Sequence, residues 1–309
     1  MRILVISQYF HPENFRINDL CIGLKNSGHS VVVLTAKPNY PKGKFFPGYS
    51  FFKKSKEVYK GIKVYRSPII PRGNASGFGL FLNYISFVIF GFFKLLFIKE
   101  KFDKIFVYAP SPITVGYLGI VASFIFRAKP FLWVHDLWPE SVKDAGGIKN
   151  KFLLFMVDQM TKSIYYFYDN ILVQSPSFKY YLLDQGVGED KIIFYPYYAE
   201  NFYKVVKENS EIKSMFGTGL KIIFAGNIGV AQSFDTIIAL CSAVMLFILP
   251  SSKNSGKLLK WDDMIKIPWD IILLFGGGLT LAASFASTGL SDWIGNNLIY
   301  LKGTHVAII

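Results

Sequence analysis

The sequence has little cysteine and little histidine. Cys21 and Cys241 are the two cysteines among 309 residues, which excludes a disulfide framework and favours a reducing compartment. We expect both to be buried as small apolar side chains. The four histidines do not cluster with cysteines or carboxylates, so we expect no metal site. The apolar run after Met1 stops at Ser7, too early for a secretory signal.

Acidic residues are also few. The chain has 21 Asp and Glu against 34 Lys and Arg, a net charge of +13, and nearly all of this excess lies in residues 1–240. Such an excess favours an anionic partner. With 51% hydrophobic and 17% aromatic residues, the chain is too apolar for a disordered or fibrous protein, and its length allows about two domains.

Short β-branched and aromatic runs alternate with helical patterns in the first part of the chain. The first helix is indicated by Ile17, Leu20, Cys21 and Leu24, with Gly28 suited to the end of a helix. This alternation predicts an α/β fold, a doubly wound parallel sheet with functional loops at the carboxyl ends of its strands. The expected strands are residues 3–6, 31–34, 104–108, 131–135, 170–173 and 191–195.

Residues 42–72 interrupt this alternation with nine Lys and Arg, one Glu and many aromatics, and we expect a loop there. The loop either docks on anionic lipid head groups or a phosphorylated acceptor, or is a solvated basic loop over a satellite core. Residues 80–98 follow, nearly all apolar, and predict a helix that lies on a membrane or in the core.

The last third of the sequence differs in kind. Residues 221–225 predict a strand, and Gly226, Asn227 and Gly229 form a turn whose backbone N–H groups suit a phosphate. Residues 271–290 carry no charge and contain three consecutive glycines, which favours a membrane helix over a buried soluble one. We therefore expect an α-helical membrane-type tail.

The most informative loop is residues 135–141, HDLWPES. At the carboxyl end of a strand, His135 suits a hydrogen bond to a sugar hydroxyl or phosphate, and Asp136 suits orienting a substrate or accepting a proton. The alternative is structural: Asp136 or Ser141 caps a helix, and His135 is a satisfied, half-buried group.

Several segments together resemble the family 4 retaining glycosyltransferases of the GT-B fold, the bacterial branch that builds O-antigen, capsule and exopolysaccharide. In chain order these segments are residues 3–10 (ILVISQYF) with Pro12 and Glu13, Gly28 and His29, Leu34 and Thr35, 38–41 (PNYP), 135–141, Ser175 and Pro176, and 226–229 (GNIG) with Gln232.

That resemblance implies a Rossmann-like acceptor-binding domain over residues 1–205, the N-terminal half of GT-B, and the start of a donor-binding domain over 206–240. It implies transfer of a sugar from a nucleotide-diphosphate sugar, expected to be UDP-linked, to a lipid-linked acceptor at the cytoplasmic face of the inner membrane. The implied catalytic residues are His135 and Asp136. Arg16, Trp138 and Glu140 would bind substrate, and Gly226, Asn227 and Gly229 the donor diphosphate, without metal or other cofactor.

The family's glutamate pair has no counterpart, since no Glu follows Glu211. Transfer would then need a donor half from another chain, and the alternative is a membrane-anchored protein that binds a lipid-linked saccharide without turnover. Residues 267–279 (IPWDIILLFGGGL), with 282–295, resemble an interior fragment of the divalent anion:sodium symporters, so a transporter fragment over 241–309 is a third hypothesis. Apolar segments beside the basic loop favour a membrane over nucleic acid as the anionic partner.

Overall fold

The structure is a computed structural model, and it describes residues 1–144, 148, 150–200, 203–205, 207, 210–215 and scattered positions between 238 and 262. Contacts divide the chain into two units, Met1–Ala231 and Gln232–Ile309. The turn at 226–229 and the expected membrane helix at 271–290 lie outside the described residues. Nearly all of the described residues belong to the first unit.

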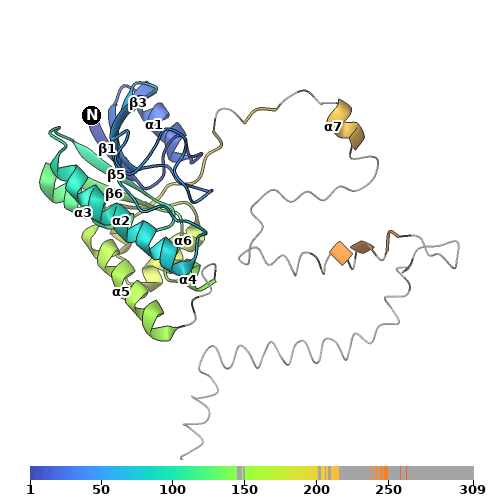
Figure 1. Cartoon of the computed structure of the whole chain (residues 1–309). Helices are drawn as coiled ribbons and strands as arrows, with labels where there is room; N and C mark the ends of the chain where they lie inside the picture. The colour runs from blue at the N-terminus through green and yellow to red at the C-terminus, as the bar shows by residue number, and fades with distance from the viewer. Residues whose placement is uncertain are drawn as a thin grey trace, which may run out of the picture. The chain divides into compact units, whose positions relative to one another are not determined.

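An eight-stranded sheet with helices on both faces forms this unit (Figure 1). Its strand order is β3-β4-β2-β1-β5-β6-β7-β8, with β3 antiparallel to β4 and all the other neighbouring pairs parallel. The predicted doubly wound α/β fold is confirmed. In chain order the elements are β1 (Arg2–Ser7), α1 (Ile17–Asn26), β2 (Ser30–Ala36), β3 (Lys56–Tyr59), β4 (Ile62–Ser67), α2 (Gly77–Leu96), β5 (Lys104–Ala109), α3 (Val115–Phe126), β6 (Lys129–Val134), α4 (Glu140–Asp144), α5 (Lys151–Phe167), β7 (Ile171–Val173), α6 (Pro176–Asp184), the 3₁₀ turn η1 (Glu189–Lys191), β8 (Ile192–Phe194) and α7 (Ser210–Met215).

Residues 42–72 correct one prediction, because part of the expected loop is a β-hairpin. β3 and β4 pair through a two-residue turn in which Lys60 and Gly61 both have positive φ, +46° and +75°. Two consecutive positive φ values match the turns whose twist suits a tight hairpin, and Gly61 adopts this conformation at low cost. The alternation of charged and apolar residues from Lys56 to Arg66 was the signal for these strands.

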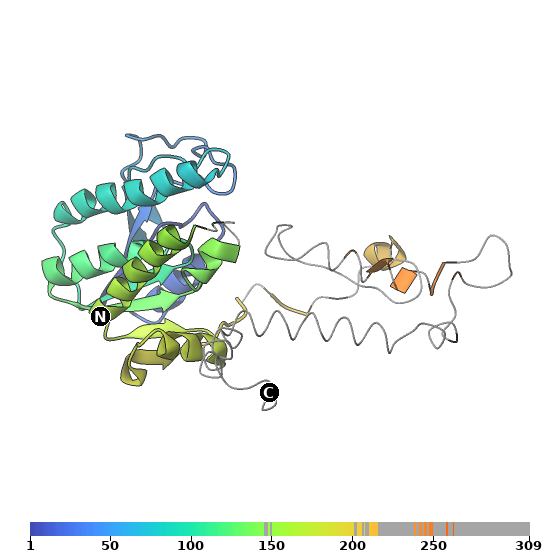
Figure 2. The same ribbon diagram turned by 90° about the horizontal axis from the view of Figure 1, so that it is seen from below.

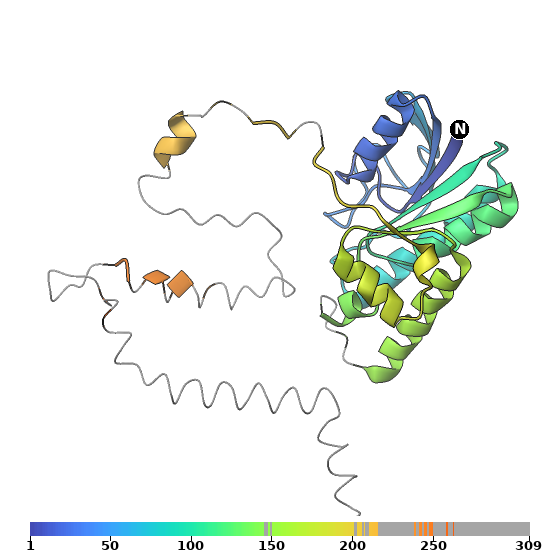
Figure 3. The same cartoon turned by 180° about the vertical axis from the view of Figure 1, so that it is seen from behind.

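Two hydrophobic clusters lie on opposite faces of the sheet. One face is covered by α2, α3 and α5, which pack on alternate strand residues such as Leu4, Ile6 and Leu34 (Figure 1). On the other face α1 buries Ile17 and Cys21 (Figure 3). Burial of Cys21 agrees with its prediction, whereas Cys241 is only half-buried.

α2 is the predicted apolar helix of residues 80–98, slightly shifted. Within the described part of the chain it is the one helix long and apolar enough to cross a membrane. Its buried residues include Asn83, Phe87, Gly91 and Leu95, which face the sheet and α3. A Cβ on Gly91 would lie 2.6 Å from a methyl carbon of Leu118, so the glycine allows α2 and α3 to run in close contact (Figure 2).

Candidate functional site

The candidate site lies at the carboxyl edge of the sheet, where the loops after β1, β2, β5, β6 and β8 meet. The expected strand 131–135 ends one residue early, so His135 is the first loop residue after β6, and its N–H donates to the Ala109 carbonyl at the end of β5. This places the HDLWPES segment beside the loop that follows β5.

His135 lies in an aromatic cage. Its ring is tilted against Trp133, Tyr108 and Tyr197, with centroids 4.3, 4.3 and 5.3 Å away. The Nδ1 atom lies 2.5 Å from the Tyr197 hydroxyl, while Nε2 is shielded from solvent and has no hydrogen-bond partner among the described residues. Burial, with a smaller contribution from the Arg16 cation, lowers the pKa of His135 to about 3. The imidazole is therefore neutral at physiological pH, and the hydrogen-bonding capacity of its Nε2 is not met by the described residues.

Arg16 packs against the same aromatic cage, on the ring of Tyr197. Its guanidinium carbon is 4.7 Å above the Tyr197 ring, its Nε is 3.7 Å from a Glu200 carboxylate oxygen, and its Nη1 donates to the Tyr198 carbonyl. The structure thus brings two predicted site residues, Arg16 and His135, to one aromatic cluster. Arg16 precedes α1, so it comes from the other end of the sequence.

Asp136 is held by a residue that sequence reasoning did not identify. The Ser111 hydroxyl, in the loop after β5, donates to an Asp136 carboxylate oxygen at 2.6 Å and accepts from the Trp138 indole N–H at 3.2 Å. A single serine therefore positions both predicted residues. The pKa of Tyr197 is raised to about 12, mainly by burial and in part by the negative charge of Asp136. The Asp136 carboxylate therefore lies within electrostatic reach of Tyr197, the residue that contacts His135 Nδ1.

Trp138 is buried, whereas Glu140 is exposed. Trp138 is 8% exposed, with its ring against Tyr84 at a centroid distance of 6.4 Å, so it contributes more to the wall than to an open stacking surface. Glu140 is exposed and accepts a hydrogen bond from the Tyr181 hydroxyl, which also lies 3.2 Å from the Trp138 carbonyl oxygen. Both remain predictions as substrate-binding residues.

In the structural alternative, Asp136 or Ser141 would cap a helix and His135 would be a satisfied, half-buried group. The Asp136 carboxylate is bound to Ser111, and the buried Nε2 of His135 is unsatisfied within the described part of the chain. Caps occur elsewhere: Ser175 accepts from the Phe178 N–H at the start of α6, with Pro176 at its first position.

Glu13 is a second residue that sequence reasoning left without a role. It is 2% exposed, and one carboxylate oxygen accepts from the N–H groups of Asn39 and Tyr40 at 2.8 and 2.7 Å, which ties the loop after β1 to the loop after β2. Burial raises the pKa of Glu13 to about 7, opposed by these hydrogen bonds. Its only sequence signal was its place in the Pro12-Glu13 pair after the first strand.

A cavity of about 280 Å³ adjoins these loops on the α1 side. His11, Glu13, Asn18, Tyr59 and Glu200 are among its lining residues. Among the residues that the structure describes, no group of three or more His, Cys, Asp and Glu side chains could hold a metal ion. The site is thus built from an imidazole, a carboxylate, a guanidinium and aromatic rings, groups suited to hydroxyl-rich and anionic ligands.

Comparison with known proteins finds a similarity in the C-terminal part of the sequence. Residues 215–309 match the family model for the sodium:sulfate symporter transmembrane region. Over 78 residues the chain is 37% identical to the sodium-dependent dicarboxylate transporter SdcS of Staphylococcus aureus and 36% identical to that of Staphylococcus saprophyticus. The matched segment covers 24% of this chain and 15% of the length of those transporters. The predicted symporter resemblance is confirmed.

Solved structures similar to part of the chain are found at low sequence identity. They include sucrose-phosphate synthase from Thermosynechococcus elongatus, with 18% identity, a TM-score of 0.45, and coverage of 63% of this chain and 47% of that one. HepE from Anabaena in complex with UDP and glucose has 14% identity, a TM-score of 0.40 and coverages of 70% and 50%. Apo UGT2 from Phytolacca americana has 8% identity, a TM-score of 0.43 and coverages of 71% and 55%. At TM-scores of 0.40 to 0.45 these likenesses are partial, and the resemblance to GT-B glycosyltransferases rests on the sequence segments given above.

Proposed function

We propose that residues 1–205 are the acceptor-binding half of a retaining glycosyltransferase, which moves a sugar from a nucleotide-diphosphate sugar to a lipid-linked acceptor. One observation carries the proposal: a neutral imidazole, His135, has a shielded Nε2 with no partner among the described residues, and the next residue along the chain, Asp136, has a carboxylate that Ser111 holds in place. The sequence segments shared with family 4 glycosyltransferases support the same reading.

In this proposal His135 hydrogen-bonds a hydroxyl of the transferred sugar, because a neutral imidazole nitrogen is a good partner for a hydroxyl. Asp136 orients the acceptor hydroxyl and accepts its proton as the new glycosidic bond forms. The bond between the anomeric carbon and the diphosphate oxygen breaks in the same transfer, and the nucleoside diphosphate leaves. Arg16 adds positive charge to the site, and Gly226, Asn227 and Gly229 would bind the donor diphosphate. The acceptor is a saccharide of cell-surface polysaccharide synthesis, met at the cytoplasmic face of the inner membrane, to which the tail would anchor the chain.

The test uses the purified full chain and a panel of UDP- and GDP-sugars. Calorimetry should show saturable binding of one donor, and transfer to a lipid-linked acceptor should fall roughly tenfold in His135→Ala, the value of about one hydrogen bond. Asp136→Asn should lower kcat by about 10² or more if the carboxylate acts as a base. His29→Ala is the matched control and should leave both unchanged.

Absence of donor binding and of transfer would overturn the transferase proposal. If the chain then still bound the lipid-linked saccharide, the alternative of a binding protein without turnover would hold. Retained transfer in both site variants would place the chemistry at other residues.

The match over residues 215–309 favours a second candidate for the C-terminal unit, sodium-coupled transport of a dicarboxylate or sulfate. We propose that this segment contributes to transport only together with further transporter segments, because such sites form between paired repeats. Sodium-driven uptake of labelled succinate or sulfate by proteoliposomes holding the full chain tests it. Uptake by this chain alone would contradict the requirement for further segments.

A further inference from the structure

The outer face of α2 is a continuous exposed apolar stripe. Its residues follow at intervals of three or four, the spacing of one helix face, and their exposed fractions range from 37% to 72%. Soluble proteins seldom leave so long an apolar strip uncovered, and those that do use it to bind a partner or a membrane. The stripe consists of Phe78, Phe81, Ile85, Ile89, Phe92 and Leu96.

The inner face of α2 keeps the helix on the sheet. Asn83 is fully buried, where it accepts from the Gln8 amide at 2.8 Å and donates to the Ile70 carbonyl at 2.6 Å. The Ser86 hydroxyl accepts from the Ile70 N–H at 2.9 Å. If α2 crossed a bilayer, the polar groups of Asn83 and Ser86 would lose these hydrogen-bond partners. α2 therefore presents its stripe from the surface of a folded domain.

The neighbouring helices extend this apolar surface. α3 contacts both α2 and α5, and the three cover the same face of the sheet (Figure 1). Phe124 at the end of α3 is 71% exposed, and at the start of α5 Phe152, Phe155 and Met156 are 70%, 59% and 52% exposed. The apolar surface thus spans three helices of one layer.

Positive charge borders the stripe. α2 contains no acidic residue. The ring of Phe51 lies 5.2 Å from that of Phe90, which brings the exposed Phe52, Lys53 and Lys54 of the basic loop close to the helix. The exposed Lys99 and Lys101 follow its other end. Lysine is depleted at protein–protein interfaces, whereas phenylalanine with lysine at its margin is typical of surfaces that lie on anionic lipid.

We infer that the outer face of α2, α3 and α5, with the loop at residues 51–54, docks on an anionic lipid bilayer. The phenylalanines enter the level of the head groups while Lys53 and Lys54 contact lipid phosphates. This docking is a property of the first unit, separate from any anchoring by the C-terminal tail, and it does not depend on the proposed transferase activity.

The experiment uses the full chain in a Cys241→Ser background, where Cys21 is buried and unreactive. Single cysteines at Phe92→Cys, Phe155→Cys and Asn26→Cys carry an environment-sensitive fluorophore. Asn26 is the matched control, because it is exposed on α1 at the opposite face of the sheet. Vesicles contain phosphatidylcholine alone or with about one third phosphatidylglycerol, with or without spin-labelled lipid as quencher.

In anionic vesicles the labels at positions 92 and 155 should brighten several-fold and be quenched by spin-labelled lipid, while the label at 26 should not respond. Lys53→Glu with Lys54→Glu should raise the lipid concentration needed for half the response by tenfold or more. Because the readout is local, insertion of the tail alone cannot produce this pattern.

Three results would overturn the inference. The first is no response at 92 and 155, or an equal response at 26. The second is an equal response to vesicles of phosphatidylcholine alone. The third is brightening that rises with protein concentration in the absence of vesicles, which would assign the stripe to a second copy of the chain.

Discussion

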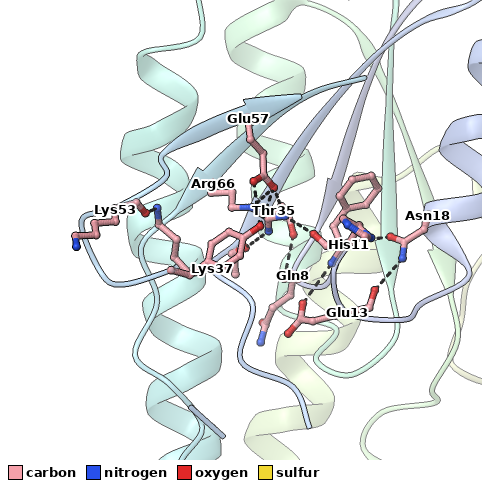
Figure 4. A network of polar contacts seen from close by, with 12 residues as sticks. Gln8, His11, Glu13, Asn18, Thr35, Lys37, Lys53, Glu57 and Arg66 are labelled. Atoms are coloured by element: carbon pink, nitrogen blue, oxygen red, sulfur yellow. Dashed lines mark hydrogen bonds and ion pairs between the residues drawn. The ribbon is translucent and has the colours of Figure 1, made fainter. Parts of the chain in front are cut away.

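The guanidinium of Arg66 is fully buried and donates from Nε to a carboxylate oxygen of Glu57 at 2.7 Å. Its other nitrogens donate to the carbonyls of Ala36, at 2.9 Å, and His11. Arg66 lies on β4 and Glu57 on β3, whereas the two carbonyls belong to the end of β2 and the loop after β1 (Figure 4). One side chain therefore joins the edge hairpin to the loops that build the site.

Neutralising Glu57 should destabilise the fold, because it leaves the Arg66 cation buried without a counter-charge. We expect Glu57→Gln to lower the free energy of unfolding by about 2 to 4 kcal/mol in urea denaturation. The matched control is Lys63→Gln, which removes an exposed ion pair to Glu100 and should cost less than about 1 kcal/mol. Equal losses in the two variants would contradict a special role for Arg66.

His135 should make stability depend on pH. Its pKa is about 3 when folded, against about 6.5 when unfolded, so between these values the unfolded chain binds a proton that the folded chain does not. The contribution of His135 to the free energy of unfolding should therefore fall as pH falls below about 6.5, whereas Glu13, with a folded pKa of about 7, contributes in the opposite sense. Between pH 7 and pH 5 we expect the free energy of unfolding of His135→Asn to change more favourably than that of the unmodified chain, by about 1 to 2 kcal/mol. His29→Asn should keep the slope of the unmodified chain, and an unchanged slope in His135→Asn would show that this residue is not the cause.

Gly119 should tolerate no side chain. A Cβ there would lie 2.1 Å from the Tyr168 hydroxyl and 2.4 Å from a methyl carbon of Val107, so α3 could not keep its distance from β5. We expect Gly119→Ala to cost about 1 to 3 kcal/mol by thermal or urea unfolding. At Gly23, on α1, a Cβ meets no atom of the described residues within 4 Å, and Gly23→Ala should stabilise the chain by about 0.5 to 1 kcal/mol. The same sign in both variants would refute this packing argument.

Ser111 should affect transfer more than folding. Without its hydroxyl, Asp136 loses its hydrogen-bond donor and Trp138 loses its acceptor. We expect Ser111→Ala to lower kcat roughly tenfold with little change in melting temperature. Ser123→Ala removes a comparable serine on α3, whose hydroxyl donates to the Ile120 carbonyl, and should leave kcat unchanged. A fall in melting temperature that matched the loss of rate would make Ser111 a structural residue.

The central strands and the first helix could be predicted because their signals are local. Residues 3–6 and 31–34 are apolar runs that need no knowledge of the rest of the chain, and they form β1 and β2. The hairpin of β3 and β4 was missed because its alternating lysines resemble a solvated loop. Its strand character depends on pairing with β2 and on burial of Arg66, both of which are long-range.

In the candidate site, too, the residues with a local sequence signal could be predicted and those that depend on long-range contacts could not. His135 and Asp136 could be selected because they stand together at the end of a predicted strand. Their partners Tyr197 and Ser111 could not, since each comes from a different loop and a lone serine or tyrosine carries no pattern. The sheet edge brings them together only once the strand order is known.

The position of Asn83 on α2 has a further consequence. Its amide contacts Gln8 and Asn39, which belong to the loops at the carboxyl edge, so the apolar stripe begins beside the candidate site. If the stripe rests on lipid and the proposed acceptor is lipid-linked, that acceptor would reach the site by lateral diffusion in the same leaflet. The encounter rate would then follow the number of acceptor molecules per unit area of membrane, and diluting them with inert lipid would slow the reaction at constant bulk concentration.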